Sequence, residues 1–256
     1  YILAPVIIFI PSYVAYAFIP FSSKLVAANV DLGLLMLLAF TTLVPLGIFA
    51  AGWGSHNKYS LLGSIRAIGA ALAYEIPLVL AGLTPVMLAG SMNLVEIVEA
   101  QASGLWFGIV AFPMLIVFFI AALMELGIAP FDMPESESEL VAGFSSEHSA
   151  MRFGLIFVAE FSNNFIMAGL LVTLFLGGWT LPFIPAAYLD VLGPFIFILK
   201  TYFIIFLFFM VRGNATRFRI DQIMAFGWKR LLPFTIVWSL LLALVLTVVR
   251  TMGGGA

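Results

Sequence analysis

"VLGPFIFILKTYFIIFLFFMV", residues 191–211, is a continuous apolar run that contains one charged residue, Lys200. A stretch of about 20 mainly apolar residues is long enough to cross a bilayer as an α-helix. Similar runs follow one another along the chain, which is 63% hydrophobic and only 9% charged. Soluble domains carry about 25% charged residues, and a soluble fold of 256 residues could not bury so much apolar surface. The composition therefore predicts an integral membrane protein.

Seven such runs predict an all-α fold, a polytopic bundle of membrane helices. They cover residues 1–21, 31–53, 64–90, 104–127, 153–177, 191–211 and 230–250. A membrane β-barrel would need alternating segments of about 10 residues, whereas these runs are longer and uniformly apolar. The sequence starts at Tyr1 inside the first run, with no initiating Met and no signal-peptide pattern. We therefore expect the natural N-terminus to lie upstream of this numbering.

The distribution of Lys and Arg predicts which loops face the cytoplasm. Eight of these residues fall in one set of loops, and two, Lys24 and Arg250, fall in the opposite set. Cytoplasmic loops of membrane proteins are enriched in Lys and Arg. We therefore expect the rich set, loops 54–63, 128–152 and 212–230, on the cytoplasmic side. The sequence shows neither a second domain nor an internal repeat, so residues 1–256 are interpreted as a single membrane domain.

Three ionisable residues, Glu75, Glu160 and Lys200, fall well inside the predicted spans, and Glu125 lies near the cytoplasmic end of its span. A charge at the centre of a bilayer costs about 2.5–3.5 kcal/mol on insertion scales. In a structural interpretation, an acid pairs with Lys200 or Arg66 and holds two helices together, or Lys200 extends to an interface. In a functional interpretation, burial raises the pKa of a carboxyl group until it exchanges a proton near neutral pH. We favour function for Glu75 and Glu160 and leave both interpretations open for Lys200.

Pro77 follows Glu75 by two residues, in "ALAYEIPL". Proline removes a backbone donor and can break or kink a helix. A kink would free a carbonyl beside the acid, where water could bind. Proline is also common in membrane helices, so this pattern only suggests a functional site.

The stretch "IAPFDMPESESELVAGFSSEHSAMRFG", residues 128–154, concentrates five of the 13 acidic residues of the chain. They are Asp132, Glu135, Glu137, Glu139 and Glu147. A run of charge usually indicates a solvated surface loop. The apolar segment "LVAGF" inside this one instead predicts that the loop folds back toward the membrane and lines a cavity with acids.

The chain has no cysteine, and its two histidines, His56 and His148, are not at metal-ligand spacing. It therefore has no thiolate to hold an iron–sulfur cluster, and we expect no metal site of its own. It also has no basic tail or low-complexity tract, so a nucleic-acid partner is not expected.

Three long motifs resemble one known family. "APFDMPESESELVAGFSSEHSAMRFGLIFVAEF" (129–161) is similar to the signature of the H-type membrane subunit of respiratory complex I, the NADH dehydrogenase subunit 1 family. "GWGSHNKYSLLGSIRAIGAALAYEIPL" (52–78) resembles a second signature of this family, and "RFRIDQIMAFGWKRLLP" (217–233) resembles its last cytoplasmic loop. The family has eight spans, of which the seven predicted here would be the second to the eighth.

The resemblance implies a subunit of a proton-pumping oxidoreductase of the cytoplasmic membrane of a prokaryote or the mitochondrial inner membrane. Such subunits enclose a quinone-binding chamber together with peripheral-arm subunits, one of which carries the nearest iron–sulfur cluster. A line of buried acids is thought to couple quinone reduction to antiporter-like and small membrane subunits. By itself the chain would be inert.

The resemblance also assigns roles to residues. Glu75, Glu125, Glu139 and Glu160 match acids of the proton path. Asp132, Glu135, Glu137 and Glu147 match acids of the loop beside the chamber, Arg66 matches an Arg near its mouth, and His148 stands among them. Arg217 and Arg219 match the basic loop that faces the peripheral arm. We predict that the four acids of the path form one water-connected line, entered from the loop.

Three departures from the family pattern leave alternatives open. Thr41 and Thr42 stand where many relatives have an intramembrane Glu, Ile128 stands where many have Arg, and His148 stands where Tyr is usual. For His148, packing or a hydrogen bond to Glu147 is favoured over a direct proton role. The same type of subunit serves archaeal F420H2 dehydrogenases, which reduce a quinone or a methanophenazine-like acceptor, and membrane-bound hydrogenases.

Two other classes of protein share part of this pattern. A stand-alone ion transporter would also carry intramembrane acids, but the absence of repeats and the long cytoplasmic motifs argue against it. A passive anchor for soluble subunits would not need buried ionisable groups inside its spans.

Overall fold

The computed structural model describes residues 1–102, 104–132, 143–181 and 186–253. Every regular element within these ranges is helical, as predicted. In chain order they are α1 (Ala4–Ala15), the 3₁₀ turn η1 (Tyr16–Phe18), α2 (Gly33–Thr41), α3 (Leu43–Gly54), α4 (Lys58–Ala89), α5 (Leu94–Ala102), α6 (Phe107–Val110), α7 (Phe112–Glu125), the 3₁₀ turn η2 (Gly143–Ser145), α9 (Met151–Phe175), α10 (Ala186–Asn214), α11 (Ile220–Phe226), the π-helical turn η3 (Gly227–Leu231) and α12 (Leu232–Gly253).

Five helical segments of the described chain, and not the predicted seven, are long and apolar enough to cross a membrane. They are Gly33–Gly54, Lys58–Ala89, Met151–Phe175, Val191–Asn214 and Ile220–Val249. The other two predicted spans, 1–21 and 104–127, contain the shorter apolar helices Ala4–Phe18 and Phe112–Glu125. The prediction of an all-α membrane bundle is confirmed, and the number of long spans is corrected.

Proline explains why these two helices are short. The first ends at Phe18 because Ile19 adopts an extended backbone (ψ 120°) before Pro20, and a residue that precedes proline disfavours the helical conformation. The second begins late because Ala111 (φ −112°, ψ 40°) leaves the helical conformation and Pro113 stands in the first turn of α7. Proline is tolerated there because the first N–H groups of a helix have no partner within the helix.

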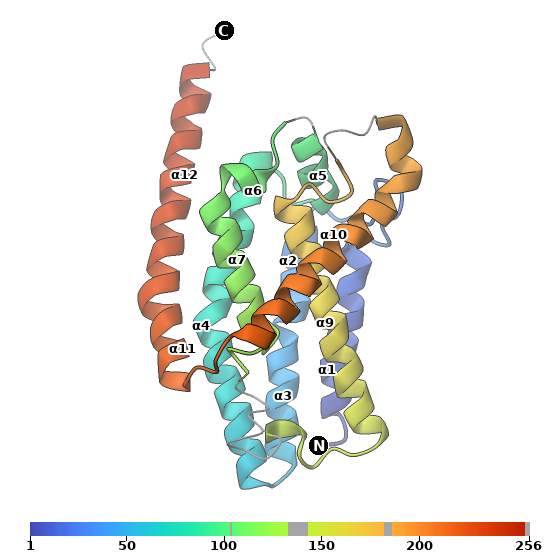
Figure 1. Cartoon of the computed structure of the whole chain (residues 1–256), viewed down its shortest axis with the longest axis vertical. Helices are drawn as coiled ribbons and strands as arrows, with labels where there is room; N and C mark the ends of the chain where they lie inside the picture. The colour runs from blue at the N-terminus through green and yellow to red at the C-terminus, as the bar shows by residue number, and fades with distance from the viewer. Residues whose placement is uncertain (103, 133–142, 182–185, 254–256) are drawn as a thin grey trace.

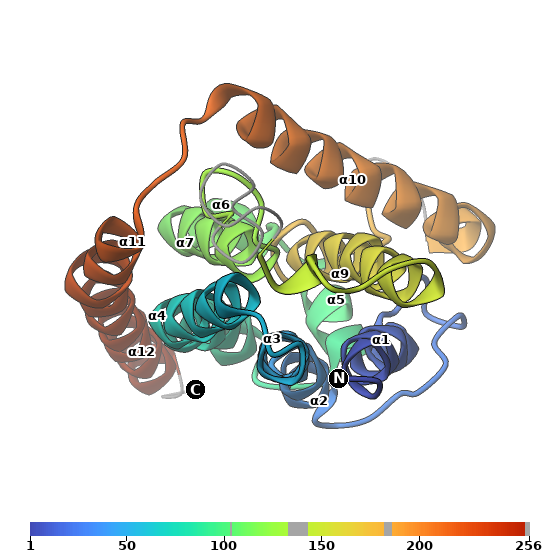
Figure 2. The same cartoon turned by 90° about the horizontal axis from the view of Figure 1, so that it is seen from below.

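The long helices form an upright bundle in which α4 and α9 occupy the centre. Helix α4 contacts α3, α7 and α12, whereas α9 contacts α1 and α10. Helix α10 crosses the bundle obliquely and α12 stands at its edge (Figure 1). Viewed from below, α10 and α11–α12 flank α7 on the outside (Figure 2). The α3–α4 turn and η2 lie at one end of the bundle, and α5 lies at the other (Figure 1).

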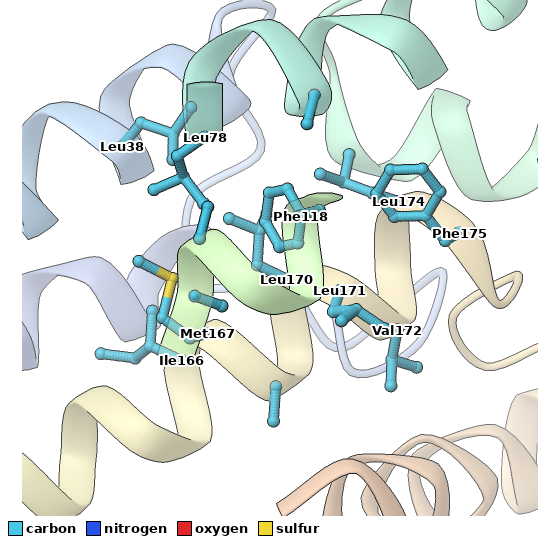
Figure 3. Packing of buried hydrophobic residues seen from close by; sticks show 14 of the residues in the cluster. Leu38, Leu78, Phe118, Ile166, Met167, Leu170, Leu171, Val172, Leu174 and Phe175 are labelled. Atoms are coloured by element: carbon cyan, nitrogen blue, oxygen red, sulfur yellow. The ribbon is translucent and has the colours of Figure 1, made fainter. Parts of the chain in front are cut away.

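Small residues let the central helices approach one another. A Cβ atom at Gly82 of α4 would lie 3.7 Å from Phe118, 3.9 Å from Leu174 and 4.0 Å from Leu38. Three other helices therefore converge on this glycine, and Phe118 is fully buried among them. Figure 3 shows this cluster, with Leu170 and Phe175 of α9 beside Phe118. Burial of this apolar surface holds the cavity described below in a fixed place.

Two of the predicted cytoplasmic loops are shorter than expected. The loop predicted at 54–63 ends at Asn57, whose side chain caps α4 by accepting a hydrogen bond from the backbone N–H of Tyr59 (3.0 Å). The loop predicted at 212–230 contains α11, and α10 extends into it as far as Asn214. In both places the end of the helix at the water interface carries polar residues. A prediction based on apolar runs therefore assigns these residues to the loop.

Helix α4 continues through Pro77 without a break. Proline leaves the carbonyl of Ala73, four residues earlier, without a helical donor. Gly227 of η3 packs directly on this carbonyl, since a Cβ at Gly227 would lie 2.6 Å from the Ala73 oxygen. The freed carbonyl near Glu75 therefore faces the backbone of η3 and not the open water site that the sequence suggested.

Candidate functional site

A cavity of about 200 Å³ lies among α3, α4, α7 and α9, beneath the loop that follows α7. Its wall includes three of the predicted acids: Glu125 at the end of α7, Asp132 in the loop and Glu160 on α9. The folded chain thus brings together carboxyl groups that are separated in the sequence. The volume holds several water molecules, each of which occupies about 30 Å³.

Glu125 is the most enclosed of these acids. Both of its carboxyl oxygens are buried and have no hydrogen-bond donor among the described residues. The hydroxyl of Tyr74 is close to this carboxyl group but outside hydrogen-bond geometry. A carboxylate is costly to bury unless donors or a counter-charge stabilise it. Glu125 therefore lacks the partners that a purely structural carboxylate would have.

Glu75 lies beside the cavity but does not line it. Its carboxyl group is half-buried on α4 and close enough to Glu125 for the two groups to interact electrostatically. Two members of the predicted line of four acids, Glu75 and Glu125, therefore lie near each other. The fourth acid of the predicted line, Glu139, falls outside the described residues, as do Glu135 and Glu137.

Sequence reasoning missed four polar residues of this cavity: Tyr74, Asn163, Asn164 and Arg212. The side-chain oxygens of Asn163 and Asn164 are buried and have no donor among the described residues. The signal was the pair of amides in "FSNNF", where an apolar span carries polar side chains. Arg212 is exposed at the end of α10 and lies at the mouth of the cavity.

An ion pair, a backbone hydrogen bond and a ring contact hold the segment that follows α7 against the basic loop, residues 212–230. Asp132 accepts a hydrogen bond from the guanidinium of Arg217 at 2.6 Å, in a partly exposed ion pair. The backbone N–H of Phe218 donates to the carbonyl of Pro130 (3.0 Å), and the rings of Phe131 and Phe218 lie 5.7 Å apart. One of the two arginines predicted to face a peripheral arm is therefore also engaged within this chain.

The far end of the acidic loop is fastened to the α3–α4 turn. The side-chain amide of Asn57 donates to the carboxylate of Glu147 (2.9 Å). The hydroxyl of Ser60 donates to the carbonyl of Phe144 (3.2 Å), and the Phe144 side chain is buried. Phe144 therefore packs inward, and the described segments on both sides of residues 133–142 are held by hydrogen bonds to other parts of the chain.

His148 is packed and does not bond to its neighbour Glu147 through its side chain. Its ring is 6% exposed and stacks on the ring of Tyr1, with centroids 4.7 Å apart. Neither ring nitrogen has a hydrogen-bond partner among the described residues. Burial lowers the pKa of His148 below its ordinary value of 6.5, and the nearby charge of Arg152 lowers it further. The imidazole is therefore neutral at neutral pH.

The two remaining basic residues of the prediction are Arg66 on α4 and Arg219 immediately before α11. Arg66 is half-buried on α4, two turns from its start. Arg219 is exposed at the start of α11, where its backbone N–H donates to the side chain of Gln222 (3.1 Å). Neither residue lines the acid cavity.

Lys200 lies far from the acids, at the opposite end of α9. Its ammonium donates to the carbonyls of Leu176 (2.7 Å), Gly178 (3.0 Å) and Thr180 (2.7 Å). It also lies 4.5 Å from the centre of the Trp106 ring. An ammonium has three donors, so all three are used. This arrangement favours the structural interpretation of Lys200, in which it closes the C-terminal end of α9.

The described part of the chain contains no group of three or more His, Asp or Glu side chains arranged to hold a metal ion.

These features define a class: a helical membrane protein with an acid-lined cavity beneath loops that are fastened to one another. A family model described as NADH dehydrogenase matches residues 1–243. The chain belongs to the NADH dehydrogenase family.

Three bacterial relatives illustrate the similarity, and each is the H-type subunit of an NADH-quinone oxidoreductase. The protein of Rhodospirillum centenum is 44% identical over 246 residues, which cover 96% of this chain and 73% of the relative. That of Rhodospirillum rubrum is 42% identical over 95% of this chain and 72% of its own length. That of Rickettsia prowazekii is 43% identical over 96% and 73%.

Proposed function

We propose that the chain is the H-type membrane subunit of a proton-pumping NADH:quinone oxidoreductase in a bacterial cytoplasmic membrane. Family membership and the names of the relatives support this assignment. The same names favour NADH and a quinone over the F420H2 and phenazine chemistry that the sequence left open. The chain has no cysteine, so an iron–sulfur cluster that delivers electrons would belong to a partner protein.

The observation that carries the coupling role is that Glu125 lines the cavity beneath the loop and has no hydrogen-bond donor among the residues that the structure describes. Intramembrane carboxyl groups that face a polar cavity are typical of proton relays. Glu160 shares this cavity, and Glu75 interacts with Glu125 from the next helix. In this proposal a proton moves among these three acids and Glu139 through water held by the amides of Asn163 and Asn164.

The fastened loops would form the floor of the quinone chamber. Asp132, Glu147 and His148 belong to the loop that would face the chamber, together with Glu135 and Glu137, and Arg66 lies near its mouth. Peripheral-arm subunits would complete the chamber from the cytoplasmic side and contact the exposed residues Arg217 and Arg219. Antiporter-like and small membrane subunits would respond to the change in protonation of the buried acids.

The shorter apolar helices would also cross the membrane, which gives the seven crossings of a single membrane domain. Helices α1 and α7 run alongside α3, α4 and α9 in the bundle (Figure 1). Helix α1 contacts α3 and α9, and α7 contacts α4. The residues that flank each helix, including α6 before α7, would complete the span.

The test compares membrane vesicles that carry the whole complex with the wild-type chain and with Glu75→Gln. NADH-driven quinone reduction and proton uptake are recorded together, after the amount of assembled complex has been measured. Glu96→Gln on α5 is the matched control, because Glu96 is an exposed acid at the other end of the bundle.

Loss of both activities in Glu75→Gln, with Glu96→Gln unaffected, would place Glu75 on the coupling path. Loss of proton uptake alone would assign Glu75 to a proton branch. If both activities survive unchanged, Glu75 is structural and the proposed path is wrong at this position.

A further inference from the structure

Residues on the wall of the acid cavity, the space of about 200 Å³ lined by Glu125 and Glu160, carry four buried side-chain atoms without a hydrogen-bond partner among the described residues. All four are oxygens: both carboxyl oxygens of Glu125 and the side-chain oxygens of Asn163 and Asn164. Asn163 is only 4% exposed. A buried oxygen costs free energy unless a donor or a cation satisfies it. Carboxylate and amide oxygens are the ligands that hard cations prefer, so a bound cation would satisfy this group of atoms.

The C-terminal end of α7 lines the same cavity. Glu125 is the last residue of α7, and residues 126–129 continue along the wall. Among the described residues, no backbone N–H donates to the carbonyls of Leu126 and Gly127. The last carbonyls of a helix form the negative end of its dipole, where a cation is stabilised. In membrane transporters, the C-terminal ends of interrupted helices coordinate Na⁺ in this way.

The charges around the cavity favour a singly charged ion. Glu160 lines the wall, and Glu75 is close enough to Glu125 for the two groups to interact electrostatically. When Glu125 is deprotonated, these acids attract a cation into the space. The exposed Arg212 lines the mouth and opposes a doubly charged ion more strongly than a singly charged one. Mg²⁺ also gives up its water reluctantly.

We propose that the acid cavity binds one Na⁺ ion, with the Glu125 carboxylate and the side-chain oxygens of Asn163 and Asn164 as ligands. Backbone carbonyls at the end of α7 would complete the coordination shell. The ion binds only when Glu125 has lost its proton, so Na⁺ and H⁺ compete for this carboxylate. The expectation of no metal site followed from the lack of cysteine and the spacing of His, whereas these ligands are all oxygens. The inference goes beyond the proposed function, which requires only that Glu125 exchange a proton.

The test measures the binding of radioactive Na⁺ to the purified whole complex at two pH values, after assembly of each complex has been checked on a gel. Glu125→Gln removes the carboxylate, and Asn163→Leu removes one amide oxygen. Asn214→Leu is the matched control, because Asn214 is exposed at the end of α10 and does not line the cavity. The difference between wild type and Glu125→Gln isolates this site from any Na⁺ that other subunits hold.

We expect wild type and Asn214→Leu to bind one Na⁺ more than Glu125→Gln, and Asn163→Leu to bind this ion at least tenfold more weakly. Because a proton competes for the carboxylate, the Na⁺ affinity of wild type should rise with pH. Equal Na⁺ binding by wild type and Glu125→Gln would overturn the proposal. Displacement of the ion by excess choline would also overturn it, because choline is too large to enter the coordination shell.

Failure of this site can be told apart from failure of the proposed function. If Glu125→Gln loses proton-coupled quinone reduction but binds as much Na⁺ as wild type, the acid exchanges protons and the Na⁺ site is wrong. If Glu125→Gln loses Na⁺ binding and keeps proton-coupled quinone reduction, the Na⁺ site stands and the proposed proton path is wrong at this position.

Discussion

Glu125 and Lys200 are both partly buried ionisable residues of the bundle, and they differ in their hydrogen-bond partners. Lys200 meets three carbonyl oxygens within 3.0 Å and an aromatic ring. Glu125 meets no donor among the described residues and lies in a polar cavity with other acids. The cost of a buried charge falls when its hydrogen bonds are satisfied. Under the proposed function, the satisfied Lys200 supports the fold, whereas the unsatisfied Glu125 exchanges a proton.

Removal of Lys200 should have the largest effect on stability. Lys200→Met would leave three carbonyls near the end of α9 without their donor, and each unsatisfied buried group costs about 1–3 kcal/mol. We expect a loss of about 3 kcal/mol or more, seen as poor assembly and a shorter half-life of the complex on heating. Lys58→Met, at an exposed lysine, is the control. Normal stability of Lys200→Met would show that Lys200 does not stabilise the fold.

Glu125→Gln should give the reverse result. The substitution preserves shape and introduces no buried charge, so assembly and thermal half-life should match wild type. Proton-coupled quinone reduction per assembled complex should fall about a hundredfold, the lower end of what removal of a proton-transferring group costs. Activity assays and gel analysis of the same membranes separate the two effects. An unstable but active Glu125→Gln complex would mean that Glu125 stabilises the fold and transfers no proton.

Gly227→Ala tests how tightly the freed carbonyl of α4 is covered. A Cβ would lie 2.6 Å from the Ala73 oxygen, so η3 must move away from the helix that carries Glu75. Overpacking of this kind costs about 1–3 kcal/mol. Gly213→Ala is the matched control, because a Cβ there meets nothing within 4 Å. Equal thermal half-lives for the two variants would show that the contact at Gly227 is loose.

Arg217→Gln should have a small effect. The pair with Asp132 is partly exposed, with 31% and 20% of the two side chains accessible. Such pairs contribute about 0–1 kcal/mol and weaken in salt. We expect a slight loss of stability that disappears at high ionic strength, measured by thermal inactivation. Arg219→Gln, the same charge change two residues away, should show no such salt dependence of stability.

His148 should give the smallest effect, confined to acid pH. Its pKa in the folded chain is lowered, so the unfolded chain binds a proton more readily. The contribution of neutral His148 is therefore complete above its ordinary pKa of 6.5 and is lost as the pH falls below it. His148→Tyr should flatten the decline in stability between pH 7 and 5. An unchanged slope would mean that the ring is accessible when protonated.

The sequence predicted the helical membrane fold because long apolar runs have few alternatives in a bilayer. It also indicated a functional role for Glu75 and Glu160, because charge is rare in such runs. The partners of these residues could not be predicted. Nothing in "FILKTYF" indicates that Lys200 reaches the carbonyls after α9, and nothing in "SNN" indicates that two asparagines line the same cavity as Glu125. These contacts depend on how helices distant in sequence pack against one another.

Redox-induced infrared difference spectroscopy on the whole complex tests the central claim most directly. The account predicts a carboxyl band that appears when quinone is reduced, shifts when glutamate is isotopically labelled and is absent in Glu125→Gln. The same band should persist in the Glu96→Gln control. A difference spectrum that is identical in wild type and Glu125→Gln would contradict the account, because the buried acid would then exchange no proton during turnover.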